Sequence, residues 1–523
     1  MLSTTRVATR DDATESRPFV DGTLQLRSVL SAALLLACVP PPSPVATPAP
    51  AHGSEQRLAI FASADMRGQL TPCGCSEAMR GGIGKAAAQL AQARGEGLPT
   101  LYLDAGDTLF ERTGLGADEA VGERRKARAL ADALRLMQLA AYAPGPLDDA
   151  LGAEFRGSLG LPELSPGQTR LLEVGGAKVG VVAGRDSSAL TAGGRKLRGS
   201  GAQFVVGLFA GAPAAAAEAQ GVDVVVAGQA RETVGAEWDD GRLIRGSVPV
   251  VQVQSRGRSL VRIDVALAPS GGPPALARGQ GDIEREFKAQ GERLQLLKAE
   301  LGQPGLSAER KQLLESRVQA LVLRRQALAA SAQSTALSPG SFTVRFIPLE
   351  AALPSDPSIE AVVAAYDKEV GELNLAWARQ HGEPCPPPAR GEAAYVGNEA
   401  CRACHPAAFA VYERTGHAHA YATLEKALKQ YRLDCIACHV VGFQQSGGVC
   451  RVDQVDQRRN VGCENCHGPG SLHAKARTAD SIPRRKPTVS TCIGCHTPEN
   501  SIHFDFAKYL PRVIGPGHGA RAD

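Results

Sequence analysis

This chain of 523 residues has few aromatic residues and little excess charge of either sign. Aromatic residues make up 4%, and 58 Lys and Arg stand against 54 Asp and Glu. A net charge of +4 is too small to indicate nucleic acid as the main partner. No apolar run reaches the roughly 18 residues that a membrane-spanning helix needs. With 43% hydrophobic and 21% charged residues the chain is of the globular type, and its length predicts roughly two to four domains.

Histidine is absent between His52 and His381, whereas cysteine and histidine are both concentrated near the C-terminus. Nine of the 13 cysteines lie between Cys401 and Cys495, and eight of those nine form four Cys-x-x-Cys pairs. Each pair is followed directly by a histidine. The four motifs are Cys401-Arg-Ala-Cys404-His405, Cys435-Ile-Ala-Cys438-His439, Cys463-Glu-Asn-Cys466-His467 and Cys492-Ile-Gly-Cys495-His496.

Cys-x-x-Cys-His is the attachment motif of c-type haem. The two thiols bind the vinyl groups of the porphyrin, and the histidine is the proximal ligand of the iron. Zinc modules also use Cys-x-x-Cys pairs, but they do not require a histidine directly after every pair. We therefore predict four covalently bound haems c, with His405, His439, His467 and His496 as the proximal ligands.

The second axial ligand is predicted by elimination. A methionine ligand would raise the reduction potential, but the four methionines, Met1, Met66, Met79 and Met137, lie far from the motifs. Histidine remains, which predicts low potentials. Five further histidines are available for four irons. An iron left open to a substrate is the alternative interpretation. The five candidates are His417, His419, His473, His503 and His518.

The stretch from Tyr395 to His518 resembles the tetrahaem cytochrome c-554 family. The resemblance is carried by YVGNEACRACH, GHAHAYATL, CIACHVVGF, NVGCENCHGPGSLH, TCIGCH and FDFAKYLPRVIGPGHG. It implies stacked haems that transfer electrons, mostly with two histidine ligands, although some relatives leave one iron five-coordinate. By motif position, the resemblance implies His417, His473 and His518 as distal ligands. We expect short helices and loops around the porphyrins over residues 391–523.

The N-terminal end predicts export. Residues 1–38 contain a ten-residue apolar stretch of signal-peptide length that ends in Leu-Leu-Ala-Cys38, which resembles a bacterial lipobox. We predict lipidation of Cys38 and a periplasmic protein anchored to the membrane by lipid; a plain signal peptide is the alternative. Residues 39–56 are rich in proline and predict an extended tether.

Residues 57–270 alternate apolar strands with alanine-rich helical stretches, which is an α/β pattern. Strands are expected at 57–63, 100–107, 177–184, 203–209, 222–228, 249–255 and 259–267. Helices are expected at 84–92 and 123–140. The order resembles the calcineurin-like metallophosphoesterases of the 5'-nucleotidase type, through FASADMRGQLTPCGC, LYLDAGDTLF, VDVVVAGQARE and VPVVQVQSRGRSLVRIDV. This resemblance implies a metallophosphoesterase-like α/β sandwich.

The family holds two metals with Asp, Asn and His ligands, but most of these positions differ here. The Asp-x-His step is Asp65-Met66-Arg67, and the Gly-Asp step is Gly106-Asp107. The family's Gly-Asn-His-Glu stretch is Gly145-Pro146-Leu147-Asp148 here, and the histidine of its Ser-His-x-Gly strand end is Phe209. Its final Gly-His-x-His is Gly228-Gln229-Ala230-Arg231. Asp65 and Asp107 remain, either as remnants at loop ends or as weak ligands of one hard cation. We expect no catalytic residue and a pseudoenzyme.

The neighbouring Cys73-Gly74-Cys75 allows three interpretations: a disulfide or redox dithiol, part of a metal site, or a purely structural pair. Residues 281–335 predict a helical hairpin, with apolar residues at heptad spacing on both arms. Residues 336–390 are expected to connect the hairpin to the haem region, with a strand at 341–348 and a helix at 357–379. Cys385 and Cys450 are left over, and in an oxidising compartment pairing of the two is open.

The sequence thus predicts an exported multihaem electron-transfer protein with a redox partner protein or a quinol-linked donor and no nucleic-acid partner. Two other functions remain open. One is a redox enzyme that acts on a small nitrogen or sulfur compound at an open iron. The other is a metal-dependent hydrolase of nucleotides or other phosphoesters.

Overall fold

The computed structural model describes residues 56–72, 79–228, 241–269, 271–277, 280–333, 337–497, 500–501 and 504–518. Cys38, Cys73, Cys75 and His503 lie outside these ranges, so the predictions for them stay predictions. In the described part of the chain, no helix combines the length and the hydropathy needed to cross a membrane.

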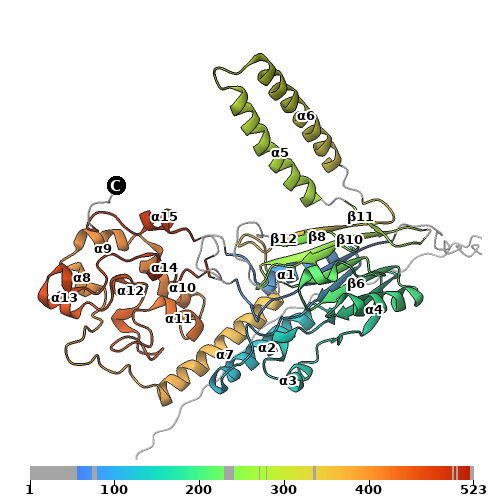
Figure 1. Ribbon diagram of the computed structural model, residues 1–523. Coiled ribbons are helices and arrows are strands. Elements are labelled where there is room, and N and C mark those ends of the chain that lie inside the picture. The colour runs from blue at the N-terminus through green and yellow to red at the C-terminus, as the bar shows by residue number, and fades with distance from the viewer. Residues whose placement is uncertain are drawn as a thin grey trace, which may run out of the picture. The chain divides into compact units, whose positions relative to one another are not determined.

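Two six-stranded sheets form the N-terminal half (Figure 1). The first has the order β11-β12-β10-β1-β2-β3, with β1 parallel to β2 and antiparallel to β10. Its strands are β1 Gln56–Ser63, β2 Thr100–Asp104, β3 Leu139–Tyr142, β10 Ser259–Leu267, β11 Ala275–Leu276 and β12 Ser341–Pro348. The second has the order β4-β5-β6-β7-β9-β8, and β5, β6, β7 and β9 are parallel. Its strands are β4 Thr169–Val174, β5 Ala177–Gly184, β6 Phe204–Phe209, β7 Val224–Ala227, β8 Arg242–Ile244 and β9 Val250–Gln252.

The two sheets pack face to face through one buried apolar cluster. Alternate residues of β1, such as Leu58 and Ile60, meet residues of β5 and β6, such as Val179 and Val206. The strands carry apolar residues on both faces because helices cover the outer face of each sheet. These helices are α1 Ile83–Gly95, α2 Ala117–Leu136, α3 Ala153–Ser158 and α4 Ser187–Gly199. The predicted α/β sandwich is confirmed.

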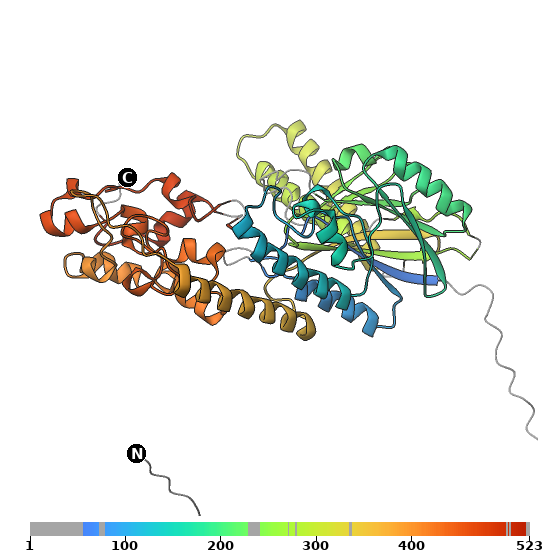
Figure 2. The ribbon, with the colours of Figure 1, turned by 90° about the horizontal axis from the view of Figure 1, so that it is seen from below.

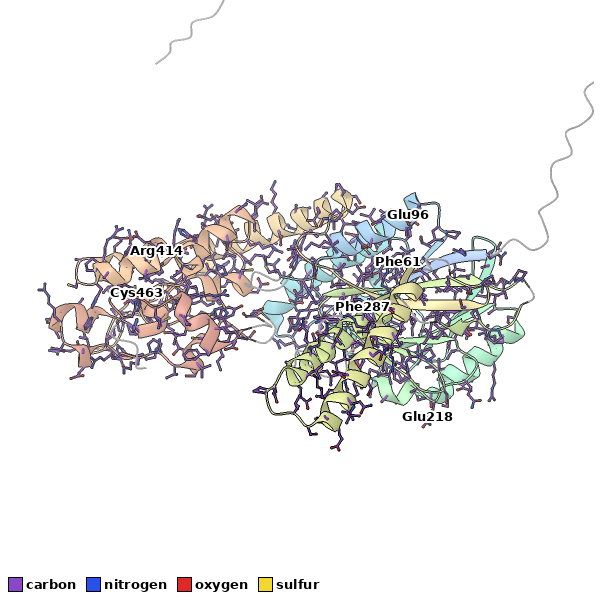
Figure 3. The ribbon with its side chains drawn as sticks, turned by 90° about the horizontal axis from the view of Figure 1, so that it is seen from above. Phe61, Glu96, Glu218, Phe287, Arg414 and Cys463 are labelled. Atoms are coloured by element: carbon purple, nitrogen blue, oxygen red, sulfur yellow. A yellow bond between two sulfur atoms is a disulfide. The ribbon has the colours of Figure 1, made fainter. Side chains whose placement is uncertain are left out.

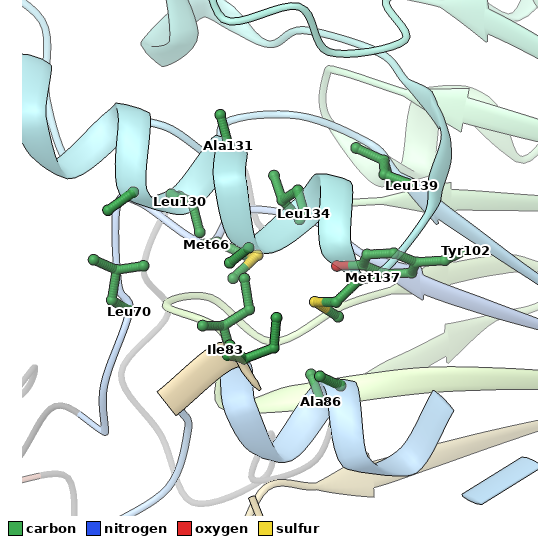
Figure 4. Packing of buried hydrophobic residues seen from close by; sticks show 14 of the residues in the cluster. Met66, Leu70, Ile83, Ala86, Tyr102, Leu130, Ala131, Leu134, Met137 and Leu139 are labelled. Atoms are coloured by element: carbon green, nitrogen blue, oxygen red, sulfur yellow. The ribbon is translucent and has the colours of Figure 1, made fainter. Parts of the chain in front are cut away.

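The outer cluster of the first sheet joins α1, α2 and the loop after β1 (Figure 4). Met66 and Ile83 pack against Leu130 and Leu134 of α2. The predicted helix at 123–140 is wrong at its C-terminal end, because Leu139–Tyr142 form β3, which pairs with β2. Buried Ala141 and Tyr142 fill the edge of the sheet there, and tertiary packing outweighs the helical propensity of the alanines.

The sandwich does not end at residue 270, which corrects the domain boundary drawn from the sequence. β12, placed in the connecting segment 336–390, pairs with β10 over eight residues, from Ser259↔Pro348 to Ala266↔Ser341. The hairpin of α5 Gln280–Leu301 and α6 Ala308–Gln333 is therefore an insertion between β11 and β12. The two helices lie side by side, with Leu294 and Leu314 buried and the Arg325 guanidinium 4.0 Å from the ring centre of Phe287 (Figures 1 and 3).

One long helix, α7 Pro357–His381, leads from the sandwich to the C-terminal region and lies along α2 (Figure 2). Asp356 caps its N-terminus by accepting hydrogen bonds from Ser358 N and Ile359 N. The C-terminal region consists of short helices and loops, as predicted. Its helices are α8 Glu399–Arg402, α9 Pro406–Tyr412, α10 Ala420–Lys426, α11 Leu433–His439, α12 Cys463–His467, α13 Ser471–Ala476, α14 Val489–Cys492 and α15 Phe506–Tyr509.

A disulfide between Cys385 and Cys450 settles the pairing that the sequence left open. It ties the proline-rich segment after α7 to the C-terminal region across 65 residues of chain. Closing a loop of this length restricts the unfolded chain and stabilises the fold by about 2–5 kcal/mol.

Candidate haem cavity and the altered metal site

Each of the four Cys-x-x-Cys-His motifs lies on a short helical turn. In the first and the fourth, the histidine N–H donates to the carbonyl of the first cysteine, at 2.9 Å for His405 to Cys401 and for His496 to Cys492. The backbone of each of these two motifs therefore closes one turn. The third motif forms α12, on which Cys463 lies (Figure 3).

All four motifs line one cavity of about 3820 Å³. Pockets for a single drug-sized ligand have volumes of ~300–1,000 Å³, so this volume suits several large cofactors. The eight motif cysteines and seven histidines line it: His405, His417, His439, His467, His473, His496 and His518. The thiol and imidazole donors that haem c requires therefore converge on one space.

Two of the three distal histidines that the resemblance implies, His473 and His417, lie close to motif histidines. The ring centres of His405 and His473 are 5.9 Å apart, with an angle of 21° between the ring planes. Those of His417 and His496 are 6.2 Å apart. Two imidazoles bound on opposite sides of one metal, each with a metal–nitrogen bond of about 2.0 Å, have ring centres roughly 6 Å apart. The spacing of both pairs fits one iron between them.

Burial and neighbouring charges keep several of these imidazoles neutral. Burial lowers the pKa of His467, and the nearby charges of Arg484, His518 and His405 lower it further, against a hydrogen bond to Arg484 O that raises it. Burial also lowers the pKa of His417, His439 and His496. Neutral imidazole is the form that binds a metal, so these environments favour ligation.

Backbone carbonyls orient several of these imidazoles. The Nδ1–H of His439 donates to Ala420 O at 2.6 Å. In the same way, the Nδ1–H of His467 donates to Arg484 O at 2.8 Å, and that of His473 donates to Thr478 O at 2.9 Å. This arrangement fixes the tautomer and leaves Nε2 as the metal-binding nitrogen. His419 is different, because its Nε2 hydrogen-bonds Glu413 O at 3.1 Å. His419 is not among the residues that line the cavity.

The sequence reasoning missed Glu464, which lies inside the third motif. Its side chain is buried, and its carboxylate accepts hydrogen bonds from Val396 N, Gly397 N and Gly470 N. It thus fastens the segment before the first motif to the turn that carries the third. A glutamate between two cysteines gives no sequence signal of this role, because its partners are backbone amides far along the chain.

The positions that correspond to metal ligands in the resembling phosphoesterase family lie at the carboxyl ends of the sandwich strands. Asp65 follows β1 and Asp107 follows β2, and both have a positive φ, of 54° and 53°. Asp65 N donates to Gly106 O at 2.7 Å, and Arg67 N donates to Asp107 O at 3.0 Å. Gly228, after β7, lies so close that a Cβ there would be 3.0 Å from that of Asp65. Asp65, Asp107 and Gly228 are thus brought together, while residues 229–231 lie outside the described ranges.

An arginine provides the positive charge at this site. Arg67 Nε donates to Asp65 Oδ1 at 2.8 Å, and the Asp65 carboxylate is buried. Burial raises the pKa of Asp107, while a hydrogen bond from Leu147 N and the charges of Arg67 and Arg185 oppose the rise. Among the described residues, no group of three or more His, Cys, Asp or Glu side chains is placed to hold a metal.

Two further carboxylates are buried beneath this edge and were not singled out as site residues. Asp148 accepts hydrogen bonds from the backbone N–H groups of Asp107, Thr108, Leu109 and Gly145, at 2.7–2.8 Å. Asp104 accepts from the hydroxyls of Ser63 and Thr108. They hold the loops after β2 and β3 together. Their role in this structure is to organise loops.

A comparison with known protein families matches the C-terminal region. Residues 400–468 match the family described as "Cytochrome c554 and c-prime". Cytochrome c-554 of Nitrosomonas europaea is 33% identical over 94 residues, which are 15% of this chain and 40% of that relative. The match therefore spans less than half of the relative's length.

Two solved structures are similar to the larger part of the chain. A 5'-nucleotidase precursor of Thermus thermophilus superposes with a TM-score of 0.41 and 13% identity, over 71% of this chain and 68% of the other. A sulfate thiohydrolase of the same organism gives a TM-score of 0.38 and 16% identity, over 67% of this chain and 68% of the other.

The segment that matches the cytochrome family includes the first three Cys-x-x-Cys-His motifs. Residues 400–468 therefore match the cytochrome c554 family, and a match to a cytochrome of the c type implies covalently bound haem c.

Proposed function

We propose that this protein is an exported electron-transfer protein with four covalent haems c. The observation that carries the proposal is the convergence of four Cys-x-x-Cys-His motifs on one cavity, with distal histidines opposite motif histidines. His405 and His473, His496 and His417, and His467 and His518 are the proposed axial pairs. His439 is the proposed proximal ligand at the second motif. Haem c, when bound, carries one electron on its iron at a potential that its axial ligands and surroundings set.

Contacts between thiols of different motifs support an order for electron transfer. Cys463 of the third motif lowers the pKa of the Cys401 thiol of the first, and Cys495 of the fourth lowers that of the Cys438 thiol of the second, so the two thiols of each pair lie close together. Cys466 of the third lies near Cys492 of the fourth. The attachment points are therefore neighbours in the order first, third, fourth, second. This order supports a continuous path for electrons through the cavity.

The sandwich is proposed to be a scaffold or docking module without hydrolase activity. In the resembling family the aspartate at this position binds a metal ion, whereas here the Asp65 carboxylate accepts a hydrogen bond from Arg67. The proposed partners are a redox protein or a quinol-linked donor. Export to the periplasm with a lipid anchor at Cys38 rests on the sequence of residues 1–38.

Haem stoichiometry tests the proposal directly. Intact mass and pyridine haemochrome spectra of the full chain, matured with haem-attachment machinery, are expected to give four haems. The double variant Cys463→Ser, Cys466→Ser is expected to give three, because the third attachment site loses both thioether bonds. The control Cys385→Ser, Cys450→Ser removes two other thiols and should keep four. Fewer than four haems on the unaltered chain would refute the proposal.

The absence of hydrolysis is a separate expectation. A generic phosphodiester offered with Mn²⁺ or Zn²⁺ should not be turned over above the rate of the metal alone, because two carboxylates, one of them paired with Arg67, cannot hold a dinuclear centre. Metal-dependent turnover that Asp107→Ala abolishes would show that the site is catalytic.

A further inference from the structure

One wall of the haem cavity comes from outside the C-terminal region. Five residues of α2 line it, as does the face of α7 from Tyr366 to Ala378. The five are Val121, Gly122, Glu123, Arg125 and Lys126. Cys435, Cys438 and His439 of the second motif line the same cavity. The sandwich and the helix that leaves it thus contribute to a space that otherwise belongs to the cytochrome domain.

Large apolar side chains are exposed on this wall. Met79 is 38% exposed, Val121 57%, Leu373 39% and Trp377 62%. They come from three separate segments, yet all four line the cavity. Several large apolar groups converging on one hollow indicate an apolar ligand, because covering them gains about 25 cal/mol per Å². A porphyrin ring held at the second motif has the chemistry to cover them.

Buried ion pairs fix this wall to the second motif. Asp367 of α7 accepts from Arg432 Nη1 at 2.8 Å and lies 3.5 Å from Lys429 Nζ. Lys429 Nζ also donates to Thr71 Oγ1, in the loop after β1, at 2.8 Å. Asn374 Nδ2 donates to Tyr431 O at 2.8 Å. These contacts hold α7 and the loop after β1 against the start of α11, the helix that carries Cys435 and Cys438.

Charges of α2 act on the same helix. Lys126 Nζ pairs with Glu123 Oε1 at 2.6 Å, and both side chains are mostly buried. Burial would raise the pKa of Asp434, beside Cys435, but the charges of Arg432 and Lys126 bring it below its usual value. A charge on α2 therefore acts on the residue next to the attachment site.

We propose that α2 and α7 form one wall of the pocket of the haem attached at Cys435 and Cys438, and that their charges and apolar side chains set the potential of this haem. The inference rests on the proposed function, since it requires a haem at the second motif. The sandwich then has a defined role as part of a haem site, because residues around the axial ligands and the exclusion of solvent change the reduction potential of a bound iron.

Spectroelectrochemical titration of the full-length holoprotein tests this inference. Lys126→Gln is expected to shift one of the four midpoint potentials downward, because losing a positive charge favours ferric iron. Glu123→Gln is expected to shift the same potential upward. Trp377→Ala is expected to shift it downward, since water reaching the pocket stabilises the more highly charged ferric state. His439→Met, which moves or removes the second haem's wave, identifies which potential belongs to that haem.

Matched controls lie on the inserted hairpin. Lys311→Gln, Glu315→Gln and Leu296→Ala change residues of the same kinds at exposed positions away from the cavity, and should leave all four potentials unchanged. Four haems with no shifted potential in Lys126→Gln, Glu123→Gln and Trp377→Ala would overturn the inference alone, as would a shift confined to another haem. A haem count below four on the unaltered chain would overturn the proposed function instead.

Discussion

Made without haem-attachment machinery, the full-length protein is expected to keep a folded sandwich and to lose the C-terminal region as an ordered unit. The sandwich has extended clusters between and outside its sheets, whereas the buried apolar cluster of the C-terminal region contains seven residues, one of them from α7. Around them lies a cavity of about 3820 Å³ that would fill with water. A region of this size with so small a core does not offset its conformational entropy without bound cofactors.

Far-UV circular dichroism and limited proteolysis measure this outcome. We expect a single cooperative transition with the helical signal of the sandwich and rapid cleavage between residues 391 and 518. The holoprotein, produced in parallel, should resist cleavage in that stretch. A second cooperative transition in the haem-free protein, or protease resistance of its C-terminal region, would show that the domain folds on protein contacts alone.

The stability of the sandwich is expected to fall as the pH rises from about 4 to about 7. Burial raises the pKa of Asp104 to about 7 and that of Asp148 to about 6, against an unfolded value of about 3.9. Between the two values the folded state binds protons that the unfolded state has released, so the free energy of unfolding decreases with increasing pH. For Asp104 this loss amounts to at most ~4 kcal/mol, and it is complete above pH 7.

Asp104→Asn should flatten this dependence, because an amide does not titrate while nearly keeping the shape of the side chain. Urea unfolding followed by circular dichroism at pH 5 and pH 8 gives the difference in the free energy of unfolding. Asp186→Asn is the control, since Asp186 is exposed and its pKa is lowered by hydrogen bonds from Ser188 and Ala189 N. Its contribution is lost below pH 4, outside this window. An unchanged pH dependence in Asp104→Asn would mean that the buried carboxyl is ionised throughout.

Much of the fold is predictable from the sequence because its signals are local. Apolar runs such as those at 177–184 and 259–267 lie between turn residues and become β5 and β10. Position-by-position comparison also identifies the ends of β1 and β2 as the altered metal site, with Asp65 and Arg67 in contact. β3 is not predictable in this way, because four residues after an alanine-rich helix carry no strand signal until β2 is beside them.

The candidate haem site also has a part that is predictable from the sequence and a part that is not. The attachment motifs are readable from spacing alone, and His417 and His473 are implied by resemblance before the structure places them opposite His496 and His405. The roles of Glu464 and of the α2 and α7 wall depend on contacts between segments tens to hundreds of residues apart. Neither hydrophobic periodicity nor motif spacing contains that information.

Low-temperature EPR combined with an optical redox titration of the full-length holoprotein tests the central claim most directly. The account predicts low-spin signals typical of two histidine ligands for the irons at the first, third and fourth motifs, all titrating at low potentials. High-spin signals from any of these three irons, or a high-potential wave typical of methionine ligation, would contradict the proposed histidine pairs and with them the path for electrons.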